Sequence, residues 1–269
     1  MLATYLTLLV LLVPASLPAP IAPRPTPRVD PSPATRRPSL AADLALAAQS
    51  QAPGRIQQQT LEVPDVGTVE YGLRIPAGYD PARPRPLVLA LHPGGPRMKA
   101  YGAWFAAEIV SPALGNLDPI IVAPDCPTRS WTDVPSERGV MAVLEHVLER
   151  YAIDRKRILV IGYSLGGRGT WFFSSRHADL FTAAIPMASP PGSEPVDRLA
   201  TIPTYVIHSR DDEVAPFEPD ERTARELEKM GRPIKFAALR GLRHYDMGGY
   251  IDALRTGVLW VAQQWRARP

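Results

Sequence analysis

Six short apolar runs constrain the fold of this chain more than any other feature of its sequence. Each is four to six residues long, mostly apolar and without regular polar alternation, and they occupy residues 87–91, 120–123, 158–161, 183–188, 204–208 and 235–239. Continuous runs of this length suit strands that are buried on both faces, as in a parallel sheet. We therefore expect them to form the centre of one mostly parallel sheet.

Segments with helical periodicity lie between these runs. In residues 139–151 the apolar side chains fall at i, i+3, i+4, i+7, i+8 and i+11, which places them on one stripe of a helix. Residues 251–265 have a similar spacing, and the segment 221–231 ends on glycine, as many helices do. Strand and helix therefore alternate along the chain.

Two further runs, 58–63 and 69–75, flank the turn residues Pro64 and Gly67 and predict an opening antiparallel pair. Alternating strands and helices across residues 55–269 predict a single α/β domain. Its three layers are a mostly parallel central sheet with helices on both faces. The apolar fraction of 45% is enough for a sizeable core.

The N-terminal residues have a different composition. Residues 2–13 are apolar and uncharged, and small residues follow, so residues 1–15 are predicted to be a signal peptide of a secreted or periplasmic protein. The apolar run is short for a membrane span, although an uncleaved N-terminal membrane anchor is the alternative. Residues 14–38 contain nine prolines, and residues 16–54 are predicted to be a disordered linker to the catalytic domain, 55–269.

The charge of the chain gives no support for a nucleic-acid partner. The whole chain has 30 basic and 27 acidic residues, and residues 16–40 alone contain four arginines against Asp30. The linker thus accounts for the basic excess, and the folded part is close to neutral. Cys126 is the only cysteine, which excludes an internal disulfide and a thiolate metal cluster within one chain.

The segment ILVIGYSLGGRGTW, residues 158–171, places Ser164 in a G-x-S-x-G motif. The motif follows an apolar strand and opens a helix, which is the context in which a serine nucleophile is held on a sharp turn. Gly162 and Gly166 avoid crowding in that turn, and Gly167 lets the helix approach the sheet. The alternative is an ordinary serine in a glycine-rich turn, or an anion site.

A serine needs a general base, and five histidines are available. His244 lies on a loop between the last strand and the last helix, at the sheet edge where the loops after parallel strands gather. It is therefore the expected base. His146 and His177 suit positions within or at the end of a helix. His92 and His208 each end a strand, so both could approach the site, although each also fits a structural role.

The acid that orients the base is expected in the loop IHSRDDEVAP, which follows the run 204–208. This loop offers Asp211, Asp212 and Glu213. A choice of Asp212 gives the chain order serine, acid, histidine, which is that of α/β-hydrolases.

The segment LHPGGP, residues 92–96 with the preceding leucine, is the expected oxyanion loop. Pro93 has no N–H, so the donor there is predicted to be Gly94, with Gly95 as the alternative. The second donor is predicted to be Leu165, after the nucleophile. Trp131, after another strand, is expected either to line the substrate pocket or to be plain packing.

Together, these segments resemble the single-domain α/β-hydrolases described as dienelactone-hydrolase-like or prolyl-oligopeptidase-type esterases, which include feruloyl and acetylxylan esterases and polyhydroxybutyrate-depolymerase-like proteins. The resemblance covers about residues 87–260. The family's acid motif, aligned with HSRDDEVAP, implies Asp212, although Ser209 and Ala215 depart from it and leave Asp211 as the second choice. Ser164 stands where dienelactone hydrolases proper have cysteine, which implies ordinary ester cleavage.

The chain is therefore expected to be a serine esterase with the triad Ser164, Asp212 and His244, without metal or cofactor. Its spacings, 48 residues from the serine to the acid and 32 on to the histidine, leave little room for a large lid. An open cleft would suit a small-molecule or a polysaccharide-linked ester. A serine peptidase of prolyl-oligopeptidase type is the alternative, and a non-catalytic binding module is a further one.

Overall fold

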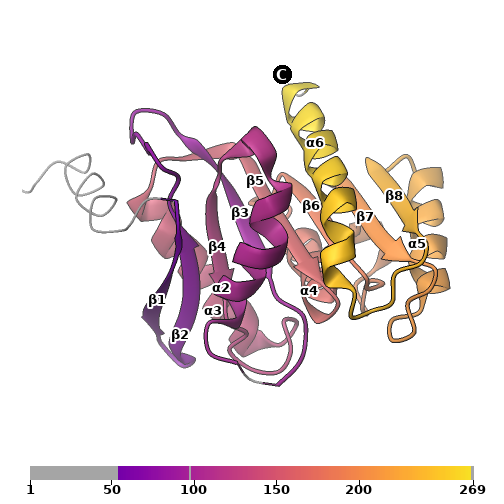
Figure 1. Cartoon of the computed structure of the whole chain (residues 1–269), viewed down its shortest axis with the longest axis horizontal. Coiled ribbons are helices and arrows are strands. Elements are labelled where there is room, and N and C mark those ends of the chain that lie inside the picture. Colours follow the sequence, from indigo (N-terminus) through magenta and orange to yellow (C-terminus); the bar gives the residue numbers. More distant parts are fainter. Residues whose placement is uncertain (1–53, 97, 268–269) are drawn as a thin grey trace, which may run out of the picture. The chain divides into compact units, whose positions relative to one another are not determined.

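The computed structural model describes residues 54–96 and 98–267. The predicted signal peptide, and the predicted linker apart from Gly54, lie outside the described residues and stay predictions. Eight strands form one sheet in the order β1-β2-β4-β3-β5-β6-β7-β8 (Figure 1). The strands are β1 Ile56–Val63, β2 Gly67–Arg74, β3 Arg85–Leu91, β4 Ile120–Pro124, β5 Ile153–Tyr163, β6 Ala183–Met187, β7 Thr204–Ser209 and β8 Ile234–Leu239.

The sheet has one antiparallel end. Strand β2 pairs antiparallel with both β1 and β4, and all pairs from β4 to β8 are parallel. The predicted antiparallel pair and the mostly parallel sheet are therefore confirmed, and each of the six apolar runs lies in or overlaps one strand.

Buried side chains of the central strands point alternately to two separate cores. In β3, Leu87, Leu89 and Leu91 contribute to one core, and Val88 and Ala90 contribute to the other. Because both faces are covered, no position of the strand calls for a polar side chain, which explains the unalternating sequence. Each fully buried aliphatic side chain contributes roughly 1.5–3 kcal/mol to the stability of the sheet.

Helices cover both faces (Figure 1). Helices α3, Val134–Arg150, and α4, Leu165–Arg176, pack on the first core, whereas α2, Tyr101–Phe105, and α6, Ile251–Ala267, pack on the second. Helix α5, Phe217–Lys229, packs through Leu227 against β7 in a smaller third cluster. The predicted helical stripes are thus the faces that meet the sheet.

The predicted start of α3 is five residues late. The helix begins at Val134, where the Asp133 side chain accepts a hydrogen bond from the Ser136 N–H at 2.9 Å and Pro135 occupies the first turn. A capping carboxylate and an early proline are both helix-start signals. The apolar stripe begins only later, because the first turn lies at the molecular surface.

No element is predicted for residues 101–117, where the structure has α2 followed by a π-helical turn, Ala106–Val110, and two short 3-10 turns. Asp125, at the end of β4, accepts hydrogen bonds from the backbone N–H groups of Gly102 and Ala100, at 2.7 and 3.0 Å. The start of this helix thus depends on a carboxylate that is distant in sequence. Local patterns cannot reveal such a cap.

No large lid covers the carboxyl ends of the strands within residues 54–96 and 98–267. In the same part of the chain, none of the helices combines the length and the apolar character that crossing a membrane requires.

Candidate active site

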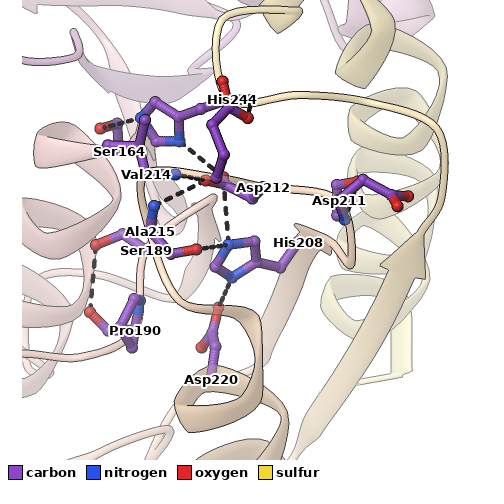
Figure 2. A network of polar contacts seen from close by, with 12 residues as sticks. Ser164, Ser189, Pro190, His208, Asp211, Asp212, Val214, Ala215, Asp220 and His244 are labelled. Carbon is purple, nitrogen blue, oxygen red and sulfur yellow. Dashed lines mark hydrogen bonds and ion pairs between the residues drawn. The ribbon is translucent and has the colours of Figure 1, made fainter.

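Ser164 lies at the turn between β5 and α4, in a conformation that non-glycine residues rarely adopt, with φ 54° and ψ −115°. Its N–H donates to the carbonyl oxygen of Met187 at 2.9 Å, and its own carbonyl accepts from the Arg168 N–H at 3.0 Å. Such a conformation costs about 1–3 kcal/mol and persists only where the surrounding structure enforces it. The turn directs the serine side chain toward the loops at the carboxyl end of the sheet (Figure 2).

The glycines beside Ser164 are needed because backbone atoms approach them closely. A Cβ atom at Gly162 would lie 2.1 Å from the carbonyl oxygen of Gly166, and one at Gly166 would lie 1.9 Å from that of Leu91. A Cβ at Gly167 would lie 2.4 Å from the Met187 carbonyl oxygen. The predicted reasons for these three glycines, a tight turn and close helix–sheet packing, agree with these distances.

His244 reaches Ser164 from the loop after β8. Its Nε2 atom lies 2.8 Å from the Ser164 Oγ atom (Figure 2). Two contacts hold its backbone: the Tyr163 hydroxyl donates to its carbonyl oxygen at 2.7 Å, and its N–H donates to the Glu213 carboxylate at 3.0 Å. Burial raises the pKa of Tyr163, so this hydroxyl stays a donor at neutral pH. Both backbone polar groups of His244 are therefore held in place, and this positions the imidazole.

Asp212 follows β7 and contacts the other ring nitrogen of His244. Its Oδ2 atom lies 2.7 Å from Nδ1, and its side chain is fully buried. The Oδ1 atom accepts hydrogen bonds from the backbone N–H groups of Val214 and Ala215, at 2.9 and 2.7 Å. These donors stabilise a carboxylate, and a carboxylate is the form that favours Nδ1–H and leaves Nε2 free to accept the serine proton.

The alternative acid, Asp211, points away from His244 (Figure 2). It is exposed, and its Oδ2 atom accepts a hydrogen bond from the Gly241 N–H at 2.6 Å. Glu213, the third acid of the loop, contacts only the backbone of His244 and not its ring. Of the three acids, Asp212 is the one whose carboxylate meets the imidazole.

The two predicted oxyanion donors lie next to each other. A Cβ atom built on Gly94 would lie 3.4 Å from the Leu165 Cβ atom. Leu165 is the first residue of α4, where backbone N–H groups have no acceptor within the helix and the helix dipole favours negative charge. Gly95, with φ 155°, lies one residue farther along the same loop, beside the Tyr101 ring.

A cavity of about 600 Å³ adjoins this pair of residues. It lies between the start of β2, the loop after β3 and the loop after β4, and both Gly94 and Leu165 line it. Its walls combine the Tyr101 ring with charged side chains from each of the three segments: Glu70, Lys99, Asp125 and Arg129. A substrate that extends from Ser164 past Leu165 would enter this space.

His92 is a structural residue of the predicted oxyanion loop. It is buried, its Nδ1 contacts the Pro93 carbonyl oxygen at 2.7 Å, and its Nε2 accepts from the Cys126 N–H at 3.0 Å. Burial lowers its pKa to about 4, so it is neutral at pH 7. The indole of Trp131, fully buried, donates to the His92 carbonyl oxygen at 3.0 Å and is absent from the cavity wall. Trp131 was expected either to line the substrate pocket or to be plain packing, and its position is that of a packing residue.

The remaining histidines also lie outside the contact with Ser164. His146 is on α3, and His177 ends α4, where its Nε2 atom contacts Glu137 at 2.9 Å. His208, at the end of β7, is buried behind Asp212 and contacts Asp220 on α5. The described residues contain no group of three or more histidine, cysteine or acidic side chains arranged to hold a metal ion.

The supporting roles of the residues around the site were not predicted from the sequence. Tyr163 and Glu213 hold the backbone of His244, and His208 with Asp220 lies behind Asp212. Tyr163 and Glu213 are each adjacent in sequence to a predicted site residue, which is the signal that could have drawn attention to them. Asp220, on a helix rich in charged residues, carries no such signal.

Part of this chain is similar to known proteins. Residues 128–245 match the dienelactone hydrolase family model. Feruloyl esterase C of Emericella nidulans is 26% identical over 185 residues, which are 63% of this chain and 65% of that protein. Cutinase est1 of Thermobifida alba is 32% identical over 136 residues, 48% of this chain and 43% of that protein. The matched region thus spans less than two thirds of these curated relatives.

Solved structures of esterases are also similar to this chain. A thermostable esterase superposes with a TM-score of 0.65 at 27% identity, covering 77% of this chain and 62% of that one. A ferulic acid esterase superposes with a TM-score of 0.65 at 17% identity, covering 79% of this chain and 99% of that one, and this likeness concerns the fold alone. Residues 128–245 are therefore similar to the dienelactone hydrolase family, and the chain has the α/β-hydrolase fold.

Proposed function

We propose that this protein hydrolyses carboxylic esters, with Ser164 as nucleophile, His244 as general base and Asp212 as the orienting acid. The observation that carries this proposal is the continuous contact from Asp212 Oδ2 through the His244 ring to Ser164 Oγ, at 2.7 and 2.8 Å. A serine hydroxyl is inert at neutral pH without such a base. The strained turn and the fixed imidazole are what this chemistry requires.

In the first half of the reaction, Ser164 Oγ attacks the ester carbonyl carbon while His244 Nε2 takes its proton. The negative charge on the tetrahedral oxygen is stabilised by the N–H groups of Leu165 and Gly94, with Gly95 as the alternative to Gly94. The imidazolium returns the proton to the departing alcohol, and the acyl group stays on Ser164. Asp212 stabilises the transient imidazolium.

In the second half, water replaces the alcohol. His244 takes a proton from water, the hydroxide attacks the acyl carbon, and Ser164 leaves with the proton that His244 returns. The products are an acid and the free enzyme. No step in this sequence calls for a metal or another cofactor.

Esters are favoured over peptides because the relatives reported above are named as feruloyl esterases and cutinases. One neighbour, described as a putative dipeptidyl aminopeptidase IV from Bacteroides ovatus, superposes at 16% identity and shares the fold only. A serine peptidase uses the same three side chains, so comparing ester with amide turnover separates these two functions.

The cavity beside Leu165 favours a bulky substrate. Its volume of about 600 Å³ can hold a bulky group, and the Tyr101 ring beside apolar and charged side chains in its wall suits an aromatic group. Within the described residues no large lid covers the site, which would leave room for an ester that is linked to a polysaccharide. Export to the periplasm or the medium, proposed from the N-terminal sequence, would bring the protein to such substrates.

Ser164→Ala provides the test. We expect this variant to lose ester hydrolysis by at least about 1,000-fold while it keeps its melting temperature, because only the nucleophilic oxygen is removed. The panel should contain p-nitrophenyl acetate, a long-chain p-nitrophenyl ester, methyl ferulate, acetylated xylan and a peptide p-nitroanilide. Turnover by Ser164→Ala near the wild-type rate would contradict the proposed nucleophile, and preferred cleavage of the anilide would favour a peptidase.

A further inference from the structure

A second buried histidine–carboxylate pair lies directly behind Asp212. His208, at the end of β7, faces Asp220 on α5, with 2.9 Å between Nδ1 and Oδ2 (Figure 2). Both side chains are fully buried. The other ring nitrogen, Nε2, lies 3.4 Å from the Asp212 Oδ2 atom, which is the same oxygen that contacts His244. The polar chain at the site therefore continues beyond Asp212 into the core.

The hydrogen-bond partners fix where the protons of this pair lie. The Nε2 atom of His208 lies 3.2 Å from the carbonyl oxygen of Ala215, which can only accept, so Nε2 carries a proton. The contact between Nδ1 and Asp220 then needs one more proton, on either the ring or the carboxyl group. In both forms the pair is neutral as a whole, and it directs an N–H group toward Ala215 and Asp212.

We propose that His208 and Asp220 form a positioning pair, which holds the turn 212–215 and keeps the Asp212 carboxylate aligned on His244. The turn is fixed from two sides. Asp212 accepts from the N–H groups of Val214 and Ala215, and His208 donates to the Ala215 carbonyl oxygen. This inference rests on the proposed ester hydrolysis, since its effect is on the triad of that reaction.

The cost of the pair supports a role at the site. Asp220 Oδ1 is buried and has no hydrogen-bond partner, and burial raises the pKa of Asp220 to about 6 against the opposing effect of His208. The neighbouring Phe217 ring packs edge-on against the His208 ring. Apolar side chains of similar total volume often stabilise such a position as well as a buried ionic pair or better. The contact with Asp212 is what an apolar pair could not reproduce.

The pair also has a consequence for activity in mild acid. The titratable groups within ion-pair distance of His208 are Asp220 on α5 and Asp212. Asp212 in turn faces His244, and its negative charge helps to raise the pKa of Tyr163 and of Tyr250. In mild acid, a second proton on the pair would place a net positive charge beside Asp212. That charge opposes the imidazolium that forms on His244, so turnover falls.

The first test is the double variant His208→Leu/Asp220→Ala, which replaces the pair by apolar side chains. We expect its melting temperature to stay within a few degrees of wild type or to rise, and kcat on p-nitrophenyl acetate to fall roughly 10- to 100-fold with KM within twofold, since a small misplacement of a catalytic group has effects of this size. Asp211→Asn is the matched control, because it changes an acid of the same turn that points away. We expect this control to keep wild-type kcat.

The second test is Asp220→Asn, which keeps a hydrogen bond to His208 Nδ1 and the Nε2 proton but cannot take up the second proton as a carboxylate does. We expect kcat within about threefold of wild type at pH 8 and a less steep loss of kcat/KM between pH 6 and 5. If the double variant does not fold, this pH profile decides, and an unchanged steepness would overturn the inference.

The outcomes also separate this inference from the proposed function. A folded double variant that keeps wild-type kcat, measured beside a wild type that hydrolyses the ester and an inactive Ser164→Ala, overturns the positioning pair only. A wild type without turnover on any ester of the panel overturns the proposed function, and the inference with it.

Discussion

At the scale of single residues, Asp212, the acid of the proposed triad, is the residue whose polar contacts are best defined. Four groups surround the Asp212 carboxylate: two backbone N–H groups, the His244 ring and the His208 ring. Because its side chain is fully buried, the charge is stabilised by fixed donors in place of water. The same donors orient the carboxylate.

A comparison of the two adjacent acids tests this environment. We expect Asp212→Asn to reduce kcat roughly 1,000-fold or more, because an amide can donate to Nδ1 and so favour the imidazole form that carries its proton on the wrong nitrogen. Asp211→Asn should stay close to wild type, since Asp211 accepts only from the Gly241 N–H and an amide oxygen can do the same. The measurement is kcat on p-nitrophenyl acetate, and equal losses in both variants would contradict the assignment of Asp212.

His92 gives a prediction for stability against pH. Its pKa is about 4 in the folded protein and about 6.5 in an unfolded chain. As the pH falls below 6.5, the unfolded chain gains the proton first, so this residue's contribution is complete above pH 6.5 and is lost progressively toward pH 4. The loss amounts to about 3 kcal/mol.

His92→Gln isolates this contribution. A glutamine can accept from the Cys126 N–H and donate to the Pro93 carbonyl oxygen, as His92 does, but it does not titrate. We expect urea unfolding of this variant to lose less stability than wild type between pH 6.5 and 4.5. Parallel decreases in the two proteins would show that the pKa of His92 is not lowered by folding.

The site residues differ in how far the sequence could predict them. Ser164, Asp212 and His244 were expected because each lies in a loop directly after an apolar run, and the structure brings these three side chains together. His208 was expected either to approach the site or to be structural. Its contact with Asp220 could not be foreseen, because it depends on how α5 packs against β7. A pairing across elements leaves no local pattern in a sequence.

At the scale of elements, the unit β5–turn–α4 positions the proposed nucleophile. Ser164 is held by the Met187 carbonyl oxygen of β6, and the first turn of α4 packs directly on the end of β3. The turn is thus enforced by three strands. Its strain is small beside the burial of those strands, where each apolar side chain contributes roughly 1.5–3 kcal/mol.

Gly166→Ala is expected to disrupt this unit. The added methyl group would lie 1.9 Å from the Leu91 carbonyl oxygen, and neither backbone can move without displacing a strand. We expect a loss of about 3 kcal/mol or more in the free energy of unfolding, measured by urea denaturation. Gly248→Ala is the matched control, since a Cβ atom there meets nothing within 4 Å, and it should change stability by less than about 0.5 kcal/mol.

Elements of the sheet were predictable, whereas the segment after β3 was not. The six apolar runs encode their strands because burial on both faces dictates composition at every position. Residues 101–117 form short α, π and 3-10 turns whose start depends on Asp125, so neither periodicity nor a local cap indicates them. The start of α3 was predicted late for a similar reason, because a helix end is set by its capping residues and not by its apolar stripe.

At the scale of the whole molecule, the parallel topology assembles the site from distant parts of the sequence. The proposed nucleophile follows β5, the proposed acid follows β7 and the proposed base follows β8, and these strands point in the same direction. Loops after parallel strands meet at one edge, which is why a sequence reading could expect the three residues to meet. The order of strands itself, with β4 between β2 and β3, was not predicted.

The predicted domain boundary can be tested by deletion. Gly54 is already tied to the sheet, since its N–H donates to the Ile75 carbonyl oxygen at 2.9 Å and its own carbonyl accepts from Arg74 at 3.2 Å. We expect a protein lacking residues 1–53 to keep the melting temperature and the kcat of the full chain. A fall in melting temperature of more than about 4 °C, roughly 1 kcal/mol, would show that the deleted residues stabilise the domain.

The hydroxyl of Tyr163 links the strand before Ser164, the proposed nucleophile, to the loop that carries His244, the proposed base. Tyr163 is the residue directly before Ser164, and it donates to the backbone of His244, 81 residues away in the chain. When thermal motion shifts the end of β5, the imidazole is pulled in the same direction. The distance between the Ser164 Oγ and His244 Nε2 atoms should therefore vary less than the position of either atom, because the two residues move together.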